Sequence, residues 1–356
     1  MKHLILLFIL ISNSDIFAQQ FPTEGYSLSN PTFLDSTISD YNVVFTAEMH
    51  WNKFNDERKK EMVTYLAKNN RINTIVLEAS YSYGYWLNQF LENGDTIFLK
   101  ELTSIYNSTD DADQKIKYQD SYSLYSWLYE FTQTNNLTIK MTGVDLEFIY
   151  KPQRPLWSFV KITEKFKDLQ VLSKSISDAE HLLTQEKITK SQFKKWFSAL
   201  EKDISKQKIS NSIFNQFINN IEQSLNFGAS KGFIYREQVM YQNFLSMINK
   251  DDKVFGQFGL SHIMLDDRQM SKNRLTTYLN QNQLFKDKIL SIGLVNYDFT
   301  TAGSAPYDEY LPFLTKEEFE RLTPEFKKLP TNTFVDLRNT DEEIKKYSQL
   351  LLIVHE

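Results

Sequence analysis

Short apolar runs that end in acidic residues recur along the first half of the chain. Runs at 43–47, 74–77 and 137–144 predict buried strands because they are rich in β-branched and aromatic residues. The acidic residues at the ends of these runs are Glu48, Glu78 and Asp145. In open parallel sheets the ligand lies beyond the carboxyl ends of the strands, so three acids at three such ends predict a site.

Helical periodicity separates these runs. Apolar residues recur at helical spacing over 55–69, 82–91, 121–135 and 233–249. We expect Asn55 to be the N-cap of the first of these helices. A strand, a helix and a second strand in succession predict a βαβ unit with parallel pairing. Further strands are expected at 253–258, 289–295 and, as the last strand, 333–338. The predicted fold class is α/β, with a mostly parallel central sheet flanked by helices and a helical insertion.

The chain divides into segments of different composition. Residues 1–18 combine Lys2, a short apolar run and a small residue at position 18, which is the pattern of a secretory signal peptide. We expect an irregular lead-in at 19–40, an α/β core at 41–150 and 232–340, a helical insertion or cap at 151–231, and a C-terminal helix or tail at 341–356. The predicted location is therefore secreted or periplasmic, without a membrane anchor.

Composition narrows the classes of function. The chain has 356 residues, 41% of them hydrophobic, and a formal net charge of −5, so a nucleic-acid surface is not expected. It has no cysteine, which excludes disulfides, thiolate metal ligands and a lipoprotein cysteine. There is no Gly-rich phosphate loop and no Gly-x-Ser-x-Gly elbow. The expected partner is a small organic substrate, and the sequence leaves the oligomeric state open.

Two of the five histidines lie at predicted strand ends. His50 follows Glu48 at the spacing that shares one face of a strand, and His262 follows the run at 253–258. A carboxylate beside an imidazole can move a proton near neutral pH. We therefore expect His50 to be a catalytic residue with Glu48, Glu78 and His262.

Arginines and aromatic residues extend the candidate site. Arg58, in the helix after His50, is a further catalytic candidate, and Arg236 is placed to pair with Asp145 or Glu78. The aromatic helix near 82–91 supplies possible contacts to an organic ligand. The candidates for substrate binding are Asp145, Arg236, Tyr81 and Trp86.

Several short motifs resemble the erythromycin esterase family, within a wider group that includes ChaN-like proteins. They occur in the family's order over about residues 40 to 340: the strand ending at His50, Leu77-Glu78-Ala79, Gly143-Val144-Asp145-Leu146, the Arg236, Met240 and Asn243 helix, Leu260-Ser261-His262 and Asp336-Leu337-Arg338. The resemblance implies an α/β fold with a helical insertion and ester hydrolysis by water. It also implies that His50 is the base, that Glu78 orients it or binds water, and that Arg58 and His262 assist.

Two differences from the family pattern favour a general hydrolase over a macrolide esterase. Ala47 stands where the esterases have the Glu of Glu-x-x-His, and Gly259 replaces the first His of a His-Asn-x-His turn. Two alternatives remain open. One is a metal-dependent hydrolase or peptidase in which a divalent ion is held by Glu48, His50, Glu78 and His262. The other is a ChaN-like protein that binds haem or another aromatic ligand. The preferred interpretation requires no cofactor.

Overall fold

The computed structural model describes residues 25–29, 32–48, 54–107, 121–227, 232–266, 273–296, 316–340 and 343–354. Its strands are β1 (Gly25–Ser27), β2 (Val43–Glu48), β3 (Thr74–Ser80), β4 (Lys140–Asp145), β5 (Val254–Gly259), β6 (Ile289–Asn296), β7 (Thr333–Asp336) and β8 (Leu350–Val354). Its α-helices are α1 (Asn55–Lys68), α2 (Tyr81–Asn93), α3 (Thr96–Asn107), α5 (Ser121–Thr134), α6 (Gln153–Lys165), α7 (Ser173–Leu183), α8 (Lys190–Ile204), α9 (Ser212–Phe227), α10 (Gly232–Met247), α11 (Leu275–Gln281) and α12 (Lys316–Phe326). The predicted α/β class is confirmed.

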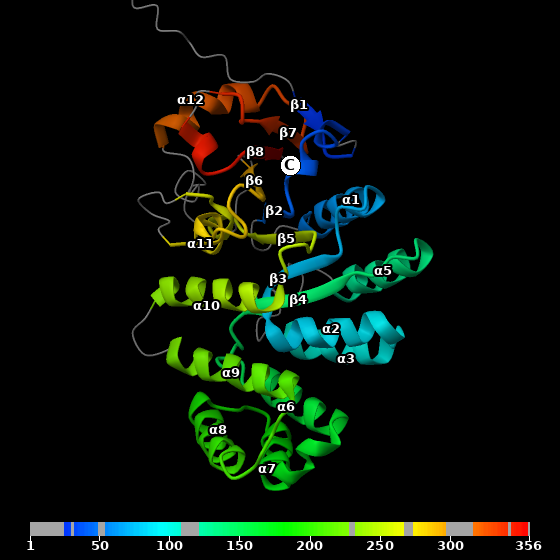
Figure 1. Ribbon diagram of the computed structural model, residues 1–356, viewed down its shortest axis with the longest axis vertical. Coiled ribbons are helices and arrows are strands. Elements are labelled where there is room, and N and C mark those ends of the chain that lie inside the picture. The colour runs from blue at the N-terminus through cyan, green and yellow to red at the C-terminus, as the bar shows by residue number, and fades with distance from the viewer. Residues whose placement is uncertain are drawn as a thin grey trace, which may run out of the picture.

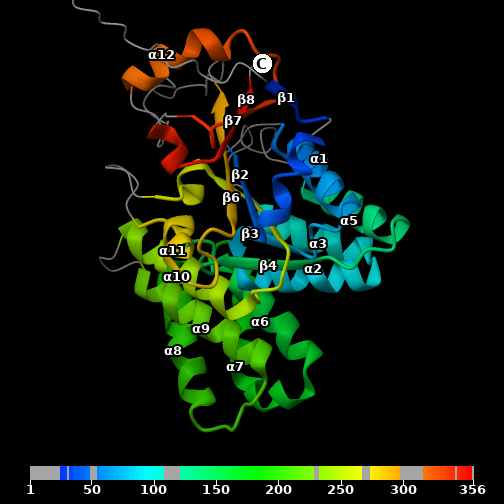
Figure 2. The same ribbon diagram turned by 45° about the horizontal axis from the view of Figure 1, so that its top comes forward.

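The strands form one sheet in the order β1-β7-β8-β6-β2-β5-β3-β4. All pairs from β8 to β4 are parallel, whereas β7 is antiparallel to both β8 and β1. Helices cover the sheet, and α6 to α9 follow one another at the lower end of the molecule, opposite α12 (Figures 1 and 2). The segment predicted to be a helical insertion contains α6, α7, α8 and α9, which are joined by turns and short loops.

The order of the sheet corrects one prediction. β2 and β3 run parallel, as a βαβ unit requires, but they do not pair with each other because β5 lies between them. Gly256 makes this central position possible. A Cβ at residue 256 would lie 2.8 Å from the ring of Phe45, which packs edge-on against Phe258 at 5.2 Å.

The two ends of the described chain also differ from the predictions. The segment expected to be an irregular lead-in contributes β1, an edge strand on β7. The segment expected to be a C-terminal helix or tail contains β8, which is fully buried between β6 and β7. Its Leu-Leu-Leu-Ile-Val sequence is the continuous apolar run expected of a strand that is covered on both faces. The strand at 333–338 is therefore not the last one.

Two further differences concern helices. α3, which the sequence analysis did not predict, follows α2 directly. The residue that precedes α1 is Phe54, so the prediction of Asn55 as N-cap is wrong. Asn55 is the first helical residue and is fully buried.

Helix α2 lies unusually close to the edge strand β4. A Cβ on Gly84 would lie 2.3 Å from the backbone nitrogen of Gly143, so only glycine allows this approach. Asn88 supplies an amide that donates to Met141 O and accepts from Met141 N, both at 2.7 Å. The side chain thereby satisfies backbone groups that the edge of a sheet leaves unpaired.

Candidate active site

Four neighbouring strands bring the predicted acidic residues to one edge of the sheet. In the order β2-β5-β3-β4, their carboxyl ends carry Glu48, Gly259, Glu78 and Asp145. Because the four strands are parallel, these ends lie together. The convergence predicted from the sequence thus follows from the strand order.

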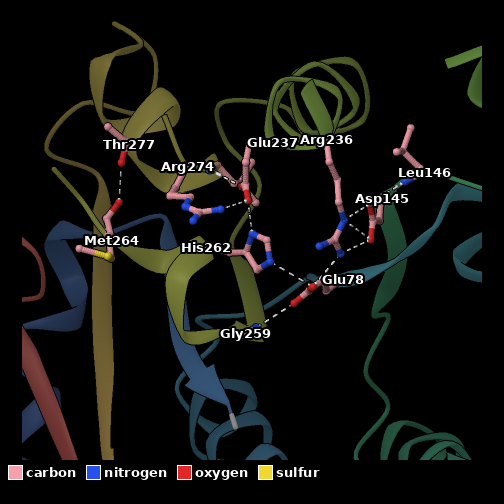
Figure 3. Close-up of polar contacts among 11 residues, drawn as sticks. Glu78, Asp145, Leu146, Arg236, Glu237, Gly259, His262, Met264, Arg274 and Thr277 are labelled. Carbon is pink, nitrogen blue, oxygen red and sulfur yellow. Dashed lines mark hydrogen bonds and ion pairs between the residues drawn. The ribbon is translucent and has the colours of Figure 1, made fainter. Parts of the chain in front are cut away.

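Glu78 lies at the centre of this edge (Figure 3). Its Oε1 accepts a hydrogen bond from Arg236 Nη2 at 2.8 Å and lies 3.1 Å from His262 Nε2. Its Oε2 accepts from the backbone N–H of Gly259 at 2.8 Å. Both oxygens of the carboxylate are therefore fixed by groups from three other elements.

Arg236, on α10, joins Glu78 to Asp145. Its Nε donates to Asp145 Oδ1 at 2.9 Å, and its Nη2 donates to Oδ2 at 2.5 Å. Asp145 is fully buried and also accepts from Leu146 N at 2.8 Å. The prediction that Arg236 pairs with Asp145 or Glu78 is confirmed, since it pairs with both.

His262 stands on the 3-10 turn Leu260–Ile263, directly after β5, and is 5% exposed. Its Nδ1 lies 2.7 Å from Glu237 Oε1, and the two side chains form an ion pair. Glu237 is also buried, accepts from Leu275 N at 2.9 Å and pairs with Arg274 at 3.1 Å. The imidazole is thus held between two carboxylates, as Figure 3 shows.

The charges of this cluster balance when His262 is protonated. The three carboxylates are Glu78, Asp145 and Glu237, and the cations that face them are Arg236, Arg274 and His262. Burial alone lowers the pKa of His262, but the charge of Glu78 and the contact with Glu237 outweigh it and raise the pKa to about 10. His262 is therefore a cation at neutral pH and is not the general base.

The same groups act on the other members of the cluster. Burial raises the pKa of Glu237, but His262 and Arg274 outweigh it and hold the pKa below its usual range. Burial lowers the pKa of Arg236, but Asp145 and Glu78 raise it by more than burial lowers it. The guanidinium therefore stays charged. The site is a preformed set of fixed charges.

The charge of His262 predicts how the stability of the fold depends on pH. Because folding raises the pKa of His262 from 6.5 to about 10, the stability that its charge contributes is fully present below pH 6.5. It is lost as the pH rises toward 10. We expect the difference in Tm between the native protein and His262→Asn to shrink from pH 6 to pH 10. Parallel Tm curves over that range would show that His262 is neutral in the folded protein.

A cleft of about 450 Å³ opens beside the cluster. Glu48, Glu78 and Arg236 form its polar side. The rest of its described wall is mostly apolar and consists of Leu146, Phe148, Ile149, Tyr150, Phe227 and Phe233, together with Glu147 and Ser224. Tyr150 and Phe233 are 66% and 68% exposed, so two aromatic rings border the cleft on the solvent side. Such a cleft suits an organic ligand with an apolar part and a polar group at one end.

The remaining predicted residues lie in different places. His50 lies outside the described residues. Arg58 is buried on α1, where its Nε donates to Asn332 Oδ1 at 3.3 Å, and it is not among the described residues that line the cleft. Tyr81 is half-buried at the start of α2. Trp86 is buried and donates to Ser158 Oγ at 3.2 Å, toward the interior.

Sequence reasoning missed Glu147, Glu237 and Arg274. Glu237 directly follows Arg236, and Glu147 comes two residues after Asp145, so both belong to stretches that had been singled out. Their burial was not visible, because a glutamate in a helix or a loop is normally solvated. Arg274 carried no signal at all.

No group of three or more His, Asp or Glu side chains is arranged to hold a metal ion in the part of the chain that is described. The predicted ligand set includes His50, which is outside that part, so the metal-dependent alternative is left to experiment. Over the same residues, no helix has both the length and the apolar character needed to cross a membrane.

Comparisons with known proteins show which solved structures resemble this fold. No family model matches the sequence, and no curated protein does. Among solved structures, a Bacillus cereus protein is 14% identical over 93% of this chain and 92% of its own, with a TM-score of 0.58. A succinoglycan biosynthesis protein is 14% identical over 94% of both chains, with a TM-score of 0.57. A His-to-Asn mutant of the erythromycin esterase EreC, in its open conformation, is 13% identical over 90% of this chain and 91% of its own, with a TM-score of 0.56.

The chain has the fold of the erythromycin esterase EreC. The resemblance seen in the short motifs is therefore confirmed at the level of the fold, over nearly the whole length of both chains. The haem-binding ChaN of Campylobacter jejuni superimposes with a TM-score of only 0.33. At 13–14% identity, the erythromycin esterase fold fixes no substrate.

Proposed function

We propose that this protein is a secreted or periplasmic hydrolase that cleaves an ester, lactone or amide bond in an organic substrate. The observation that carries the proposal is the fixed set Glu78, His262 and Arg236, of which Glu78 and Arg236 lie on the polar side of a mostly apolar cleft. Clusters of buried charges with a shifted pKa, here the raised pKa of His262, are typical of active sites.

In the proposed reaction His50 is the general base and takes a proton from water. The resulting hydroxide attacks the carbonyl carbon, and the carbon–oxygen bond of an ester or lactone, or the carbon–nitrogen bond of an amide, then breaks. The leaving oxygen or nitrogen takes the proton from His50, which becomes neutral again. Glu48 and Glu78 support His50 and the water, since both line the cleft. His262 is a positioning residue, because its ring nitrogens face Glu78 and Glu237 and hold Glu78 in place.

Arg236 is the cation best placed to stabilise the developing oxyanion. Its Nε and Nη2 are used by Asp145 and Glu78, but its Nη1 has no hydrogen-bond partner among the described residues. The side chain is 17% exposed and lines the cleft. A donor that is fixed in advance stabilises a transition state without reorganisation during the reaction.

The direct test is a screen of the purified protein for hydrolysis. 4-Nitrophenyl acetate, butyrate and octanoate, an aliphatic lactone and a peptide anilide are assayed with and without EDTA. We expect turnover of an ester or the lactone, with a preference for an apolar acyl group, and no effect of EDTA. Turnover that is lost with EDTA and restored by a divalent ion would establish the metal-dependent alternative instead. No turnover of any substrate would contradict the proposal.

The location is tested separately. The pattern at residues 1–18 predicts that an exported protein begins at Gln19 or a neighbouring residue. N-terminal sequencing of the exported protein checks this, and an intact Met1 would contradict it.

A further inference from the structure

Glu147 is a buried carboxyl in the cleft wall that the proposed mechanism does not use. It is 1% exposed and follows β4 in the segment 146–150, every residue of which lines the cleft. Its Oε1 accepts from the backbone N–H of Ser82 at 2.9 Å, and its Oε2 accepts from Ser82 Oγ at 2.8 Å. One carboxyl thereby connects the cleft wall to the first turn of α2, 65 residues away in sequence.

A chain of buried hydrogen bonds ends at Glu147. Trp86 Nε1 donates to Ser158 Oγ at 3.2 Å, Ser158 Oγ lies 2.9 Å from Tyr106 OH, and Tyr106 OH lies 2.6 Å from Ser82 Oγ. An indole N–H can only donate, and each hydroxyl has one hydrogen. If Ser82 donates to Glu147, then Tyr106 donates to Ser82 and Ser158 donates to Tyr106. Every hydrogen in the chain then points toward the carboxylate, which strengthens the last bond cooperatively.

We propose that Glu147 is a positioning residue for the substrate, because its two bonds to Ser82 fix the apolar cleft wall at 146–150. Two anchors hold this wall, one just before it at Asp145 and one within it at Glu147. Asp145 is fixed by Arg236, and Glu147 is fixed by Ser82. Between and after these two anchors lie Leu146, Phe148, Ile149 and Tyr150, the apolar surface that a substrate would contact.

The protonation state of Glu147 sets the strength of this contact. Burial raises the pKa of Glu147 to about 7, although the bonds from Ser82 oppose the rise. The groups around it are Asp145, which also raises its pKa, Tyr81 and Tyr106, which are neutral at this pH, and Arg154, whose guanidinium lies over the rings of Tyr106 and Phe148. Glu48, Glu78 and Arg236 line the same cleft.

Protonation of Glu147 weakens its contact with Ser82 but stabilises the fold as a whole. Above pH 7 the carboxylate accepts charge-assisted bonds, which are about twice as strong as neutral ones, so the wall is held most firmly. Below pH 7 the neutral carboxyl relieves the cost of a buried charge, and the whole fold gains stability as the pH falls. If Glu147 only stabilised the fold, the wall at 146–150 would become firmer as the pH falls and the fold gains stability. A positioning role predicts instead that the wall loosens as the pH falls.

This inference rests on the proposed hydrolysis for its kinetic test but not for its structural test. The structural test is hydrogen–deuterium exchange of peptides covering 146–150 and the start of α2, at pH 6 and pH 8 after correction for intrinsic rates. We expect Glu147→Gln to exchange about tenfold faster than the native protein in these peptides at pH 8, with β2 and β5 unchanged. The native protein should approach the behaviour of the variant at pH 6.

The kinetic test uses the best ester of the screen. Glu147→Gln is expected to raise KM about three- to tenfold at pH 8 with kcat nearly unchanged, and to lose the rise in KM that the native protein shows from pH 8 to pH 6. Changes common to both proteins come from other groups, including His50. Glu92→Gln, at the exposed C-terminal end of α2, is the matched control and should behave as the native protein. Ser82→Ala, which keeps the backbone bond, should give a smaller shift in the same direction.

Several outcomes would overturn the inference. One is unchanged exchange at 146–150 in Glu147→Gln, and another is faster exchange that is spread equally over the sheet. If Glu147→Gln does not fold, an unchanged KM and unchanged exchange in Ser82→Ala would overturn it as well. If no ester is turned over, the proposed function fails, and the exchange experiment still decides whether Glu147 holds the wall.

Discussion

Replacing Glu78 by glutamine, or His50 by alanine, is expected to lower kcat for ester hydrolysis about 10²- to 10⁴-fold, the range typical of lost acid–base catalysis. Glutamine keeps the shape of Glu78 but removes the charge that faces Arg236 and His262. The described residues that line the cleft include no histidine, so none of them supplies the imidazole that His50 provides in the proposed reaction. Steady-state kinetics on the preferred ester measures both effects.

Matched controls separate chemistry from folding. His181→Ala changes an exposed histidine on α7, and Glu164→Gln changes an exposed glutamate on α6. Both should retain kcat within about twofold, since exposed substitutions away from a site rarely act on it. If either Glu78→Gln or His50→Ala kept full turnover in a folded protein, the proposed mechanism would be wrong.

Replacing Arg236 by methionine is expected to destabilise the fold by about 3–5 kcal/mol, the usual result of removing one partner from a buried ion pair. Asp145 is fully buried and would lose the cation that faces it in a medium that solvates it poorly, whereas Glu78, 11% exposed at its side chain, would keep His262. Urea denaturation followed by circular dichroism gives the free energy of unfolding.

A second substitution identifies the cause of this loss. Asp145→Asn removes the buried charge while leaving an oxygen that can accept from Leu146 N. The double variant Arg236→Met/Asp145→Asn should therefore recover part of the stability lost in Arg236→Met. Arg338→Met is the control, since Arg338 makes a similar fork with Asp336 near the surface, and it should cost no more than about 1 kcal/mol. An equal loss in both single variants would show that burial of the Arg236 pair is not the cause.

The sequence by itself determined most of the elements that build the site. Five of the strands were predicted because a buried strand is recognisable as a short run of adjacent apolar residues: β2, β3, β4, β5 and β6. The acids at the ends of β2, β3 and β4 were visible for the same reason. Their convergence followed from a general rule of parallel sheets rather than from any contact.

Elements at the ends of the chain were less predictable. The apolar run Leu350–Val354 is short and close to the terminus, and nothing local distinguishes a central strand from a buried tail. Its position between β6 and β7 depends on hydrogen bonds to residues far away in sequence. β1 has only three residues and owes its extended form to pairing with β7.

Only the tertiary structure decided what the charged residues do. The insertion of β5 between β2 and β3 brings His262 to Glu78, and α10 brings Glu237 to its other side. These neighbours, and not the histidine's own surroundings in sequence, make His262 a cation. Likewise, Glu147 meets Ser82 because Gly84 and Gly143 let α2 approach β4 closely. Strand and helix patterns are local, so the sequence reveals them, whereas the charge of a buried group depends on partners that only the folded chain brings together.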